Sequence, residues 1–530
     1  MTTVLAVATG AQAAALTAAS IGAAAVLVLR DSRARAVAML ASLLLAVGAV
    51  AALKRHAIAD GISGHGALAL AAAVAGLVGL AILAEIMRRR PEAFALLAFA
   101  ALPFRVPVTI GSENANLLLP LYGVIAAGAV AFALRRLRPG AEDAPDPAGT
   151  PGARALRRVE IALAIVLVVY AAQSAYSSDV TQATVSVCCF YVPFAVLFRL
   201  LLDVPWTTRL LRQVFGVVVA LALLFAAVGF VESATGRLLI SNSKVVEANE
   251  IKPYFRVNSL FFAPNIYGRF LALTMIVLAA SLPALRRGRQ VALVAAALAV
   301  LWFGMVLSLS QSSFAALLLG LLVLAALRWR PLLVVGVVAA ALVVGAVVVV
   351  AAPDQVGLHT GSSKGLDKST SGRSDLIKGG ARMARDRPIW GFGSGSFAND
   401  FRKRERVHSE KSAAASHTIP VTVAAEQGVI GLASYLWLLF CAFALLFGGG
   451  LRRAVRAGPP EERVGRAAMA AAYAGLVLHT LVYAAFLEDP LSWVLLALGA
   501  SLRLAADARA AGGSPAPEPA QAREPEAATV

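Results

Sequence analysis

The chain consists of apolar runs that recur along nearly its whole length, each about 17–25 residues long, the length that crosses a bilayer as an α-helix. Hydrophobic residues make up 59% of the 530 residues and charged residues only 15%. A water-soluble core could not bury that much apolar surface, and a disordered chain would have low hydropathy. We therefore predict an all-α polytopic integral membrane protein with about 13–15 transmembrane helices.

The charge breaks between the runs define the predicted spans. They lie near residues 4–29, 36–53, 67–87, 92–109, 117–134, 159–175, 183–200, 213–231, 265–284, 291–307, 312–327, 332–351, 429–448, 467–486 and 490–505. The run 92–109 is the weakest, because Pro103, Arg105 and Pro107 interrupt it.

Lys and Arg are distributed unevenly between the short turns. Arginine clusters near residues 88–90, 135–136, 157–158, 286–289, 328–330 and 452–453 should face the cytoplasm. The turns 176–182 and 487–490 contain no Lys or Arg and should lie outside. Because this rule explains much of the net charge of +18, the charge is not evidence for a nucleic-acid partner. The expected environment is membrane lipid.

The predicted organisation has four parts. Residues 1–209 form N-terminal spans with a flexible cytoplasmic linker at 139–153, residues 446–511 form C-terminal spans, and residues 512–530 form a disordered tail. Between them, residues 210–445 contain two large loops that map outside, at 232–265 and at 353–427. Three cysteines, Cys188, Cys189 and Cys441, lie in apolar runs without a CxxC pair and indicate core residues, with no disulfide framework or metal site.

The loop 353–427 should be partly helical. The segment beginning at Ser371 predicts a helix with Ser374 as its cap, Leu376, Ile377 and Met383 on its apolar face, and Pro388 after its end. A glycine-rich turn, 390–397, follows. The loop holds 12 Lys and Arg against 8 Asp and Glu, which suits an anionic ligand or equally anionic lipid headgroups.

Several polar residues near the predicted outer face suit chemistry on an anionic substrate. His417 precedes Pro420, which can occupy the first turn of a helix, so the imidazole would lie at a helix start as a candidate general base. Arg256 lies just outside the span 265–284 and Arg269 one turn inside it, where a charge is costly. Arg373 is a further candidate, because the arginine fork binds phosphate oxygens. A solvated histidine, a snorkelling Arg269 and structural ion pairs are the alternatives.

Four segments resemble the O-antigen ligase/polymerase superfamily of bacterial membrane glycosyltransferases. They are 256–265 with its Pro-Asn at a span start, the serine-rich hairpin 308–313, the start of a large loop at 372–397, and the loop end at 417–431. Their order, with the large loop between late spans, is that of the family, and the resemblance covers roughly residues 210–445.

The resemblance implies an inner-membrane glycosyltransferase of the ligase or polymerase type. It would move a glycan from undecaprenyl diphosphate to an acceptor hydroxyl at the outer face, with inversion and without a cofactor or metal. The site residues so implied are His417 as the catalytic base, Arg256, Arg373 and Arg269 as diphosphate-binding residues, and Asn265, Ser310 and Glu426 as candidates for supporting roles.

Other functions fit the same chain. A lipid-linked glycan flippase would also be polytopic and basic, but would place its charges near mid-membrane. A protein O-oligosaccharyltransferase differs only in its acceptor, which the motifs do not identify. Another lipid-dependent glycosyltransferase fold would show paired acidic residues in an early outer loop, whereas the segment 57–66 has only Asp60. A non-catalytic paralogue would have the same sequence features.

Overall fold

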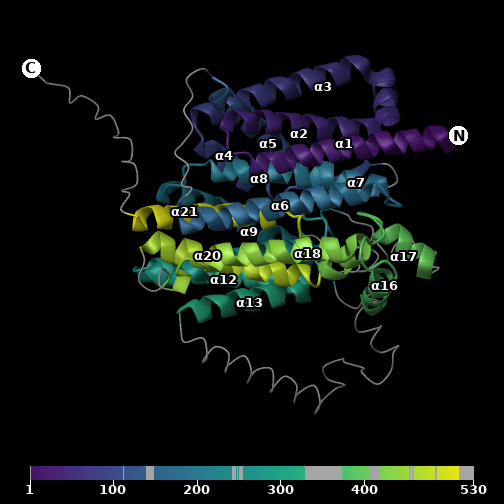
Figure 1. Cartoon of the computed structure of the whole chain (residues 1–530). Helices are drawn as coiled ribbons and strands as arrows, with labels where there is room; N and C mark the ends of the chain where they lie inside the picture. Colours follow the sequence, from purple (N-terminus) through teal and green to yellow (C-terminus); the bar gives the residue numbers. More distant parts are fainter. Residues whose placement is uncertain are drawn as a thin grey trace, which may run out of the picture.

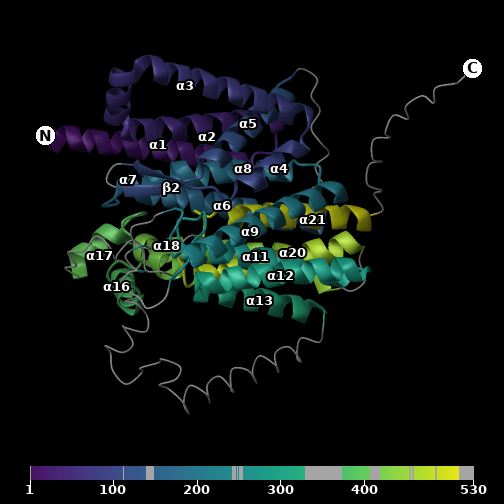
Figure 2. The ribbon, with the colours of Figure 1, turned by 180° about the vertical axis from the view of Figure 1, so that it is seen from behind.

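The computed structural model describes residues 2–110, 113–138, 149–240, 246, 249, 255–328, 373–405, 418–452, 455, 459–483 and 486–511. These residues form an elongated bundle of helices that run side by side (Figure 1; Figure 2 shows the reverse side). Within the described part, ten helices are long and apolar enough to cross a membrane. The prediction of an all-α polytopic membrane protein is confirmed.

The N-terminal half of the bundle contains these elements: α1 (Thr2–Val28), α2 (Ser32–Leu53), α3 (Arg55–Arg89), α4 (Glu92–Ala101), α5 (Leu119–Arg136), α6 (Pro151–Ser174), α7 (Val180–Val185), the π-helical turn η1 (Ser186–Tyr191) and α8 (Val192–Leu202). The C-terminal half contains α9 (Thr208–Thr235), α11 (Pro264–Ser281), the short 3₁₀ helix η2 (Leu282–Ala284), α12 (Gly288–Ser308), α13 (Gln311–Arg328), α16 (Arg373–Asp386), α17 (Phe397–Glu405), α18 (Ile419–Phe447), α20 (Pro460–Thr480) and α21 (Pro490–Ala510).

One predicted span, 92–109, is wrong. Its helix, α4, has only ten residues, and the chain then forms an antiparallel hairpin of β1 (Val106–Ile110) and β2 (Glu113–Leu117). Prolines on either side of Arg105 prevent the helix from continuing, and the β-branched residues that follow favour an extended strand. The predicted span 332–351 lies outside the described residues, and α6 and α20 begin with charged residues. Within the described residues, ten helices qualify as candidate spans, and Gln12–Val28 of α1 and Glu92–Ala101 are shorter apolar helices.

The arginine clusters of the short turns lie at one end of the bundle. At this end, which we call the basic end, the arginine clusters bind neighbouring helix termini: Arg135 Nη1 donates to the Met87 carbonyl at 3.2 Å, and Arg157 Nη1 to the Val28 carbonyl at 2.7 Å. The opposite end, the loop end, carries α16 and α17 (Figure 1). The described arginine clusters lie at the ends of α3, α5, α13 and α18 and at the starts of α6 and α12, on the side of the bundle opposite α16 and α17 (Figure 1).

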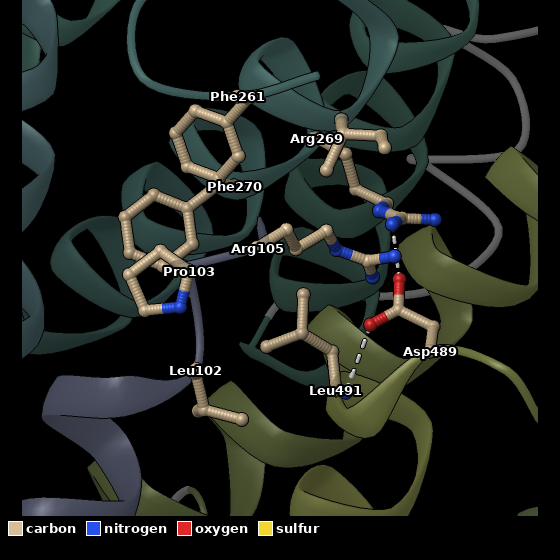
Figure 3. A pocket seen from close by; sticks show the side chains of 9 residues that line it. Leu102, Pro103, Arg105, Phe261, Arg269, Phe270, Asp489 and Leu491 are labelled. Carbon is tan, nitrogen blue, oxygen red and sulfur yellow. Dashed lines mark hydrogen bonds and ion pairs between the residues drawn. The ribbon is translucent and has the colours of Figure 1, made fainter. Parts of the chain in front are cut away.

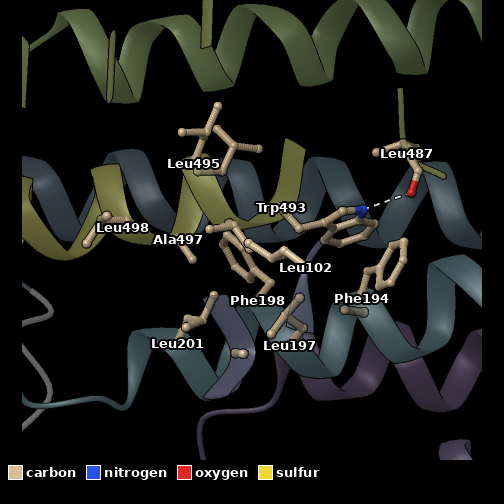
Figure 4. Packing of buried hydrophobic residues seen from close by; sticks show 14 of the residues in the cluster. Leu102, Phe194, Leu197, Phe198, Leu201, Leu487, Trp493, Leu495, Ala497 and Leu498 are labelled. Carbon is tan, nitrogen blue, oxygen red and sulfur yellow. Dashed lines mark hydrogen bonds between the residues drawn. The ribbon is translucent and has the colours of Figure 1, made fainter. Parts of the chain in front are cut away.

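The interior of the bundle is filled by large apolar side chains. Figure 4 shows Trp493 of α21 against Phe198 of α8, in an edge-to-face arrangement with ring centroids 6.4 Å apart. The Trp493 indole Nε1 donates to the Leu487 carbonyl at 2.9 Å, which satisfies its polar group inside the core. Van der Waals packing of this kind stabilises helix contacts within a bilayer. It also fixes the start of α21, which lies beside the candidate site.

Candidate functional site

Arg256 lies in the segment that leads into α11 and is held by three different partners. Its Nε donates to the Ser308 carbonyl at 3.1 Å, and its Nη2 donates to Asn265 Oδ1 at 3.1 Å. The Asn249 side chain binds the Arg256 backbone twice, at 3.0 and 3.1 Å. Two segments that the sequence analysis identified separately, 256–265 and 308–313, therefore meet at the loop end, and these bonds orient the guanidinium.

The serine-rich segment forms a tight turn between α12 and α13. Leu309 adopts a left-handed backbone with φ of 48°, and the Ser310 hydroxyl lies 2.8 Å from that of Ser313. Ser310 also accepts the Ser313 N–H at 3.4 Å and so caps α13. The Ser312 hydroxyl is 3.1 Å from His479 Nε2. Ser310 is buried within this network, so its observed role is to order the turn against which Arg256 rests.

A buried carboxylate that the sequence analysis did not select holds the Arg256 segment. Glu232, near the end of α9, is fully buried and accepts backbone N–H groups of Ser259 at 2.7 Å, Leu239 at 2.9 Å and Asn258 at 3.2 Å. Backbone donors of this kind offset the desolvation of a buried carboxylate. The only sequence signal was a single acidic residue at the end of an otherwise apolar run.

Arg269 is buried in an ion pair with Asp489, and each residue is only 1% exposed. Figure 3 shows the two side chains joined in this pair beside a small cavity that both of them line. Asp489 Oδ1 also accepts the Leu491 N–H at 3.0 Å and caps α21, whereas Arg269 Nε and Nη1 have no hydrogen-bond partner among the described residues. Arg269 therefore does not snorkel, and two of its donor groups remain available beside the cavity.

The glycine-rich turn 390–397 is bound to the first part of α18 through Glu426. The Glu426 carboxylate accepts the N–H groups of Gly395 at 2.9 Å and Phe397 at 3.0 Å, and its carbonyl accepts the Gly393 N–H at 2.8 Å. Gly391, with φ of 67°, lies so close that a Cβ there would stand 2.3 Å from the Glu426 carbonyl carbon. Glu426 is thus a buried anchor for the turn and for the start of α17.

The same turn is also fixed to the end of α6. The Tyr176 hydroxyl donates to the Trp390 carbonyl at 2.6 Å, and the Ser394 N–H donates to the Gln173 carbonyl at 3.3 Å. Gln173 Nε2 in turn donates to the Gln427 carbonyl at 3.1 Å. Segments far apart in the sequence therefore converge at the loop end.

The helix predicted after Ser371 is present as α16, but it begins at Arg373, one residue before the predicted cap. Leu376 and Met383 are buried as predicted, whereas Ile377 is 41% exposed and does not belong to the buried face. α16 packs against α18 and with α17 encloses a small apolar cluster of its own. The side chain of Arg373 lies outside the described part of the structure.

His417, the predicted catalytic base, also lies outside the described residues. The chain resumes at Thr418, which occupies the N-cap position of α18, and Pro420 lies in the first turn as the sequence predicted. Of the seven predicted site residues, the described side chains are therefore Arg256, Asn265, Arg269, Ser310 and Glu426. The structure gathers all five at the loop end.

Comparison with known proteins identifies one family region. Residues 295–436 match the family model described as O-antigen ligase, a range that includes the serine turn, the glycine-rich turn and Glu426. The match supports assignment to the O-antigen ligase superfamily, which the sequence resemblance had indicated. No curated protein matches the chain.

Proposed function

We propose that this chain, a multi-pass membrane protein with an O-antigen ligase domain at residues 295–436, transfers a glycan from an undecaprenyl-diphosphate donor to an acceptor hydroxyl. The family region supports a membrane glycan ligase or polymerase in general. The particular donor, the inverting stereochemistry and the absence of a metal requirement are parts of the proposal.

The observation that carries the proposal is the meeting of two arginines with the family region at one end of the bundle. Arg256 is oriented by Asn265 and by the Ser308 carbonyl, and Arg269 keeps two donor groups without partners. A preorganised pair of guanidinium groups suits a diphosphate, because the planar fork matches two phosphate oxygens. Such donors stabilise negative charge most strongly where water is excluded.

In the proposed reaction, the oxygen of the acceptor hydroxyl attacks the anomeric carbon of the donor sugar. The bond from that carbon to the diphosphate oxygen breaks, and its electrons leave with the diphosphate. His417 takes the acceptor proton, while Arg256, Arg373 and Arg269 bind the diphosphate as its negative charge increases. A single displacement of this kind inverts the anomeric centre. The arginines neutralise the leaving group, so no metal is needed.

The proposal also assigns an orientation. Short basic loops face the cytoplasm in most membrane proteins, so the basic end should be cytoplasmic and the loop end should face the periplasm or exterior. A flippase is less well supported, because the described candidate residues gather at one end, whereas a transporter site usually lies near the bilayer midplane. The acceptor is a glycan, a lipid or a protein, and assays with each of the three distinguish these classes.

The test is glycan transfer by the purified full-length protein in nanodiscs, with lipid-linked glycan as donor and sugar, lipid and peptide acceptors in separate reactions. His417→Ala should lower the rate by about 10²–10⁴-fold, as expected for loss of a general base. His408→Ala, in the same loop, is the matched control and should retain transfer. Transfer by His417→Ala at the wild-type rate with every acceptor would refute the assignment. Chelation should leave the rate unchanged, and NMR of the product reports the anomeric configuration.

A further inference from the structure

Arg105, which interrupts a predicted span in the sequence, lines the same cavity as Arg269 and Asp489. It stands at the junction between α4 and β1, far in sequence from the family region. Figure 3 shows the Arg105 side chain extending toward Asp489 beside the guanidinium of Arg269. The other residues that line the cavity are apolar, among them Phe261 and Phe270. The cavity therefore presents two cations and one anion within an apolar wall.

The charges in this cavity are not balanced by the described residues. Asp489 pairs with Arg269, whose Nε and Nη1 lack partners although the residue is only 1% exposed. Arg105 forms no hydrogen bond or ion pair within the described part of the chain. Two guanidinium groups close together in an apolar setting repel each other, and a buried donor without a partner is destabilising. An anion bound between them would relieve both effects.

A further carboxylate near Arg105 is bound to another side chain. Glu488 lies within electrostatic range of Arg105, but its Oε1 accepts the Ser186 hydroxyl at 2.8 Å. Burial raises the pKa of Glu488 above its ordinary value, which favours the neutral acid, although Ser186 and Arg105 oppose this. The hydroxyl of Tyr483 is also within range of Arg105 and Arg269, and burial raises its pKa, so it stays neutral and adds no negative charge.

We propose that Arg105 is a diphosphate-binding residue that acts with Arg269, so that the N-terminal half of the chain contributes directly to the donor site. The inference rests on the proposed function for the identity of the anion. Each guanidinium would donate to phosphate oxygens, while Asp489 keeps Arg269 in place from the other side. The apolar lining excludes water and so strengthens these bonds.

The experiment measures binding of farnesyl diphosphate, a prenyl diphosphate without a glycan, to the full-length protein in nanodiscs of zwitterionic lipid. Arg105→Gln should raise the Kd at least tenfold, as expected for loss of charge-assisted hydrogen bonds. Arg105→Lys should lie between, because an ammonium cannot donate bidentately. Arg286→Gln, an exposed arginine at the basic end, is the control and should bind like the wild type. Farnesol, which lacks the diphosphate, should bind the wild type and Arg105→Gln equally.

Several outcomes would overturn the inference. One is that Arg105→Gln binds farnesyl diphosphate with the same Kd as the wild type. If Arg105→Gln does not fold, the same Kd in Arg105→Lys as in the wild type would overturn the inference. A second is an equal loss of farnesol binding, which would indicate a structural role. A third is that anionic lipid in the nanodisc abolishes farnesyl diphosphate binding by the wild type, with Arg105 required for this competition. That result would assign the site to a headgroup phosphate. If the wild type binds farnesyl diphosphate through Arg105 but transfers no glycan, the inference stands and the proposed function fails.

Discussion

Replacing Glu426 by alanine should release the glycine-rich turn while leaving the transmembrane bundle intact. The carboxylate is the only acceptor shown for the N–H groups of Gly395, at 2.9 Å, and Phe397, at 3.0 Å. Both groups are buried behind the turn, so water cannot readily replace the lost acceptor. The turn would keep the bonds that its neighbours make to the backbone of α18, such as that from the Gly393 N–H to the Glu426 carbonyl.

The expected size of the effect follows from these two contacts. Leaving a buried N–H group without its acceptor costs about 1–3 kcal/mol, so loss of the Glu426 side chain costs the turn about 2–6 kcal/mol of local stability. A change of about 1.4 kcal/mol is a factor of ten, so amide exchange in the segment 390–397 should accelerate by roughly 10–10⁴-fold. The lower figure is the safer one, since neighbouring contributions are not additive.

Hydrogen exchange with peptide-level mass spectrometry on the protein in nanodiscs measures this directly. Glu405→Ala is the matched control: Glu405 belongs to α17 in the same module but forms a partly exposed ion pair with Arg382 at 2.6 Å. Such pairs contribute at most about 1 kcal/mol, so its exchange in 390–397 should change less than tenfold. If the amide exchange rate of the segment 390–397 in Glu426→Ala equals that of the wild type, the reasoning is refuted, because the other contacts of the turn would then be sufficient to hold it.

Two further substitutions test separate features. Gly391→Ala should lower the thermal unfolding midpoint, because φ is 67° and the new Cβ would lie 2.3 Å from the Glu426 backbone. The control is Gly216→Ala within α9, where nothing lies within 4 Å of the added carbon, so the midpoint should stay unchanged or rise slightly. Equal shifts of the midpoint in the two variants would contradict this prediction. Glu488→Gln should flatten the pH dependence of the midpoint. The raised pKa means that the folded state binds the proton more tightly, so the stability linked to Glu488 is full below its ordinary value of 4.5 and is lost as pH rises through the folded pKa. Identical slopes above pH 4.5 in the wild type and Glu488→Gln would exclude this linkage.

The helices could be predicted from the sequence because their lengths are set by the bilayer and their ends by charge. The predicted spans in the described residues fall on helices of the structure, with one exception. That exception, 92–109, has a mean hydropathy like that of a span, and only its prolines indicated otherwise. Hydropathy cannot distinguish a short helix followed by a hairpin from a continuous helix, because it does not include backbone geometry.

The site could be predicted only in part. Arg256 and Asn265 were identifiable because they flank a span start, and in the structure Arg256 Nη2 donates to Asn265 Oδ1 at 3.1 Å. The partners of the arginines could not be predicted from the sequence. Asp489 follows Arg269 by 220 residues, and nothing in the local sequence links the two. In the sequence, Arg105 indicates only that a predicted span is interrupted. Contacts between distant segments depend on how the helices pack, which composition and spacing do not determine.

Two buried glutamates at the loop end play the same structural role, because each accepts backbone N–H groups of a neighbouring segment. Glu232 binds the backbone of the segment that carries Arg256, and Glu426 binds the backbone of the glycine-rich turn. Each carboxylate projects from a helix and binds N–H groups that would otherwise lack acceptors in a buried setting. These anchors lie within the protein, so the segment that carries Arg256 and the glycine-rich turn are held by groups of the chain itself.

This arrangement has a consequence for catalysis by positively charged groups. Arginines that must reorganise when a diphosphate binds lose part of the interaction energy, whereas arginines fixed in advance apply all of it as charge develops on the leaving group. Arg256 is fixed through its side chain by Asn265 and the Ser308 carbonyl, and Arg269 by Asp489. Under the proposed function, loss of a partner of either arginine should therefore slow transfer more than it weakens donor binding, since the contacts of these partners in the structure orient the guanidinium groups.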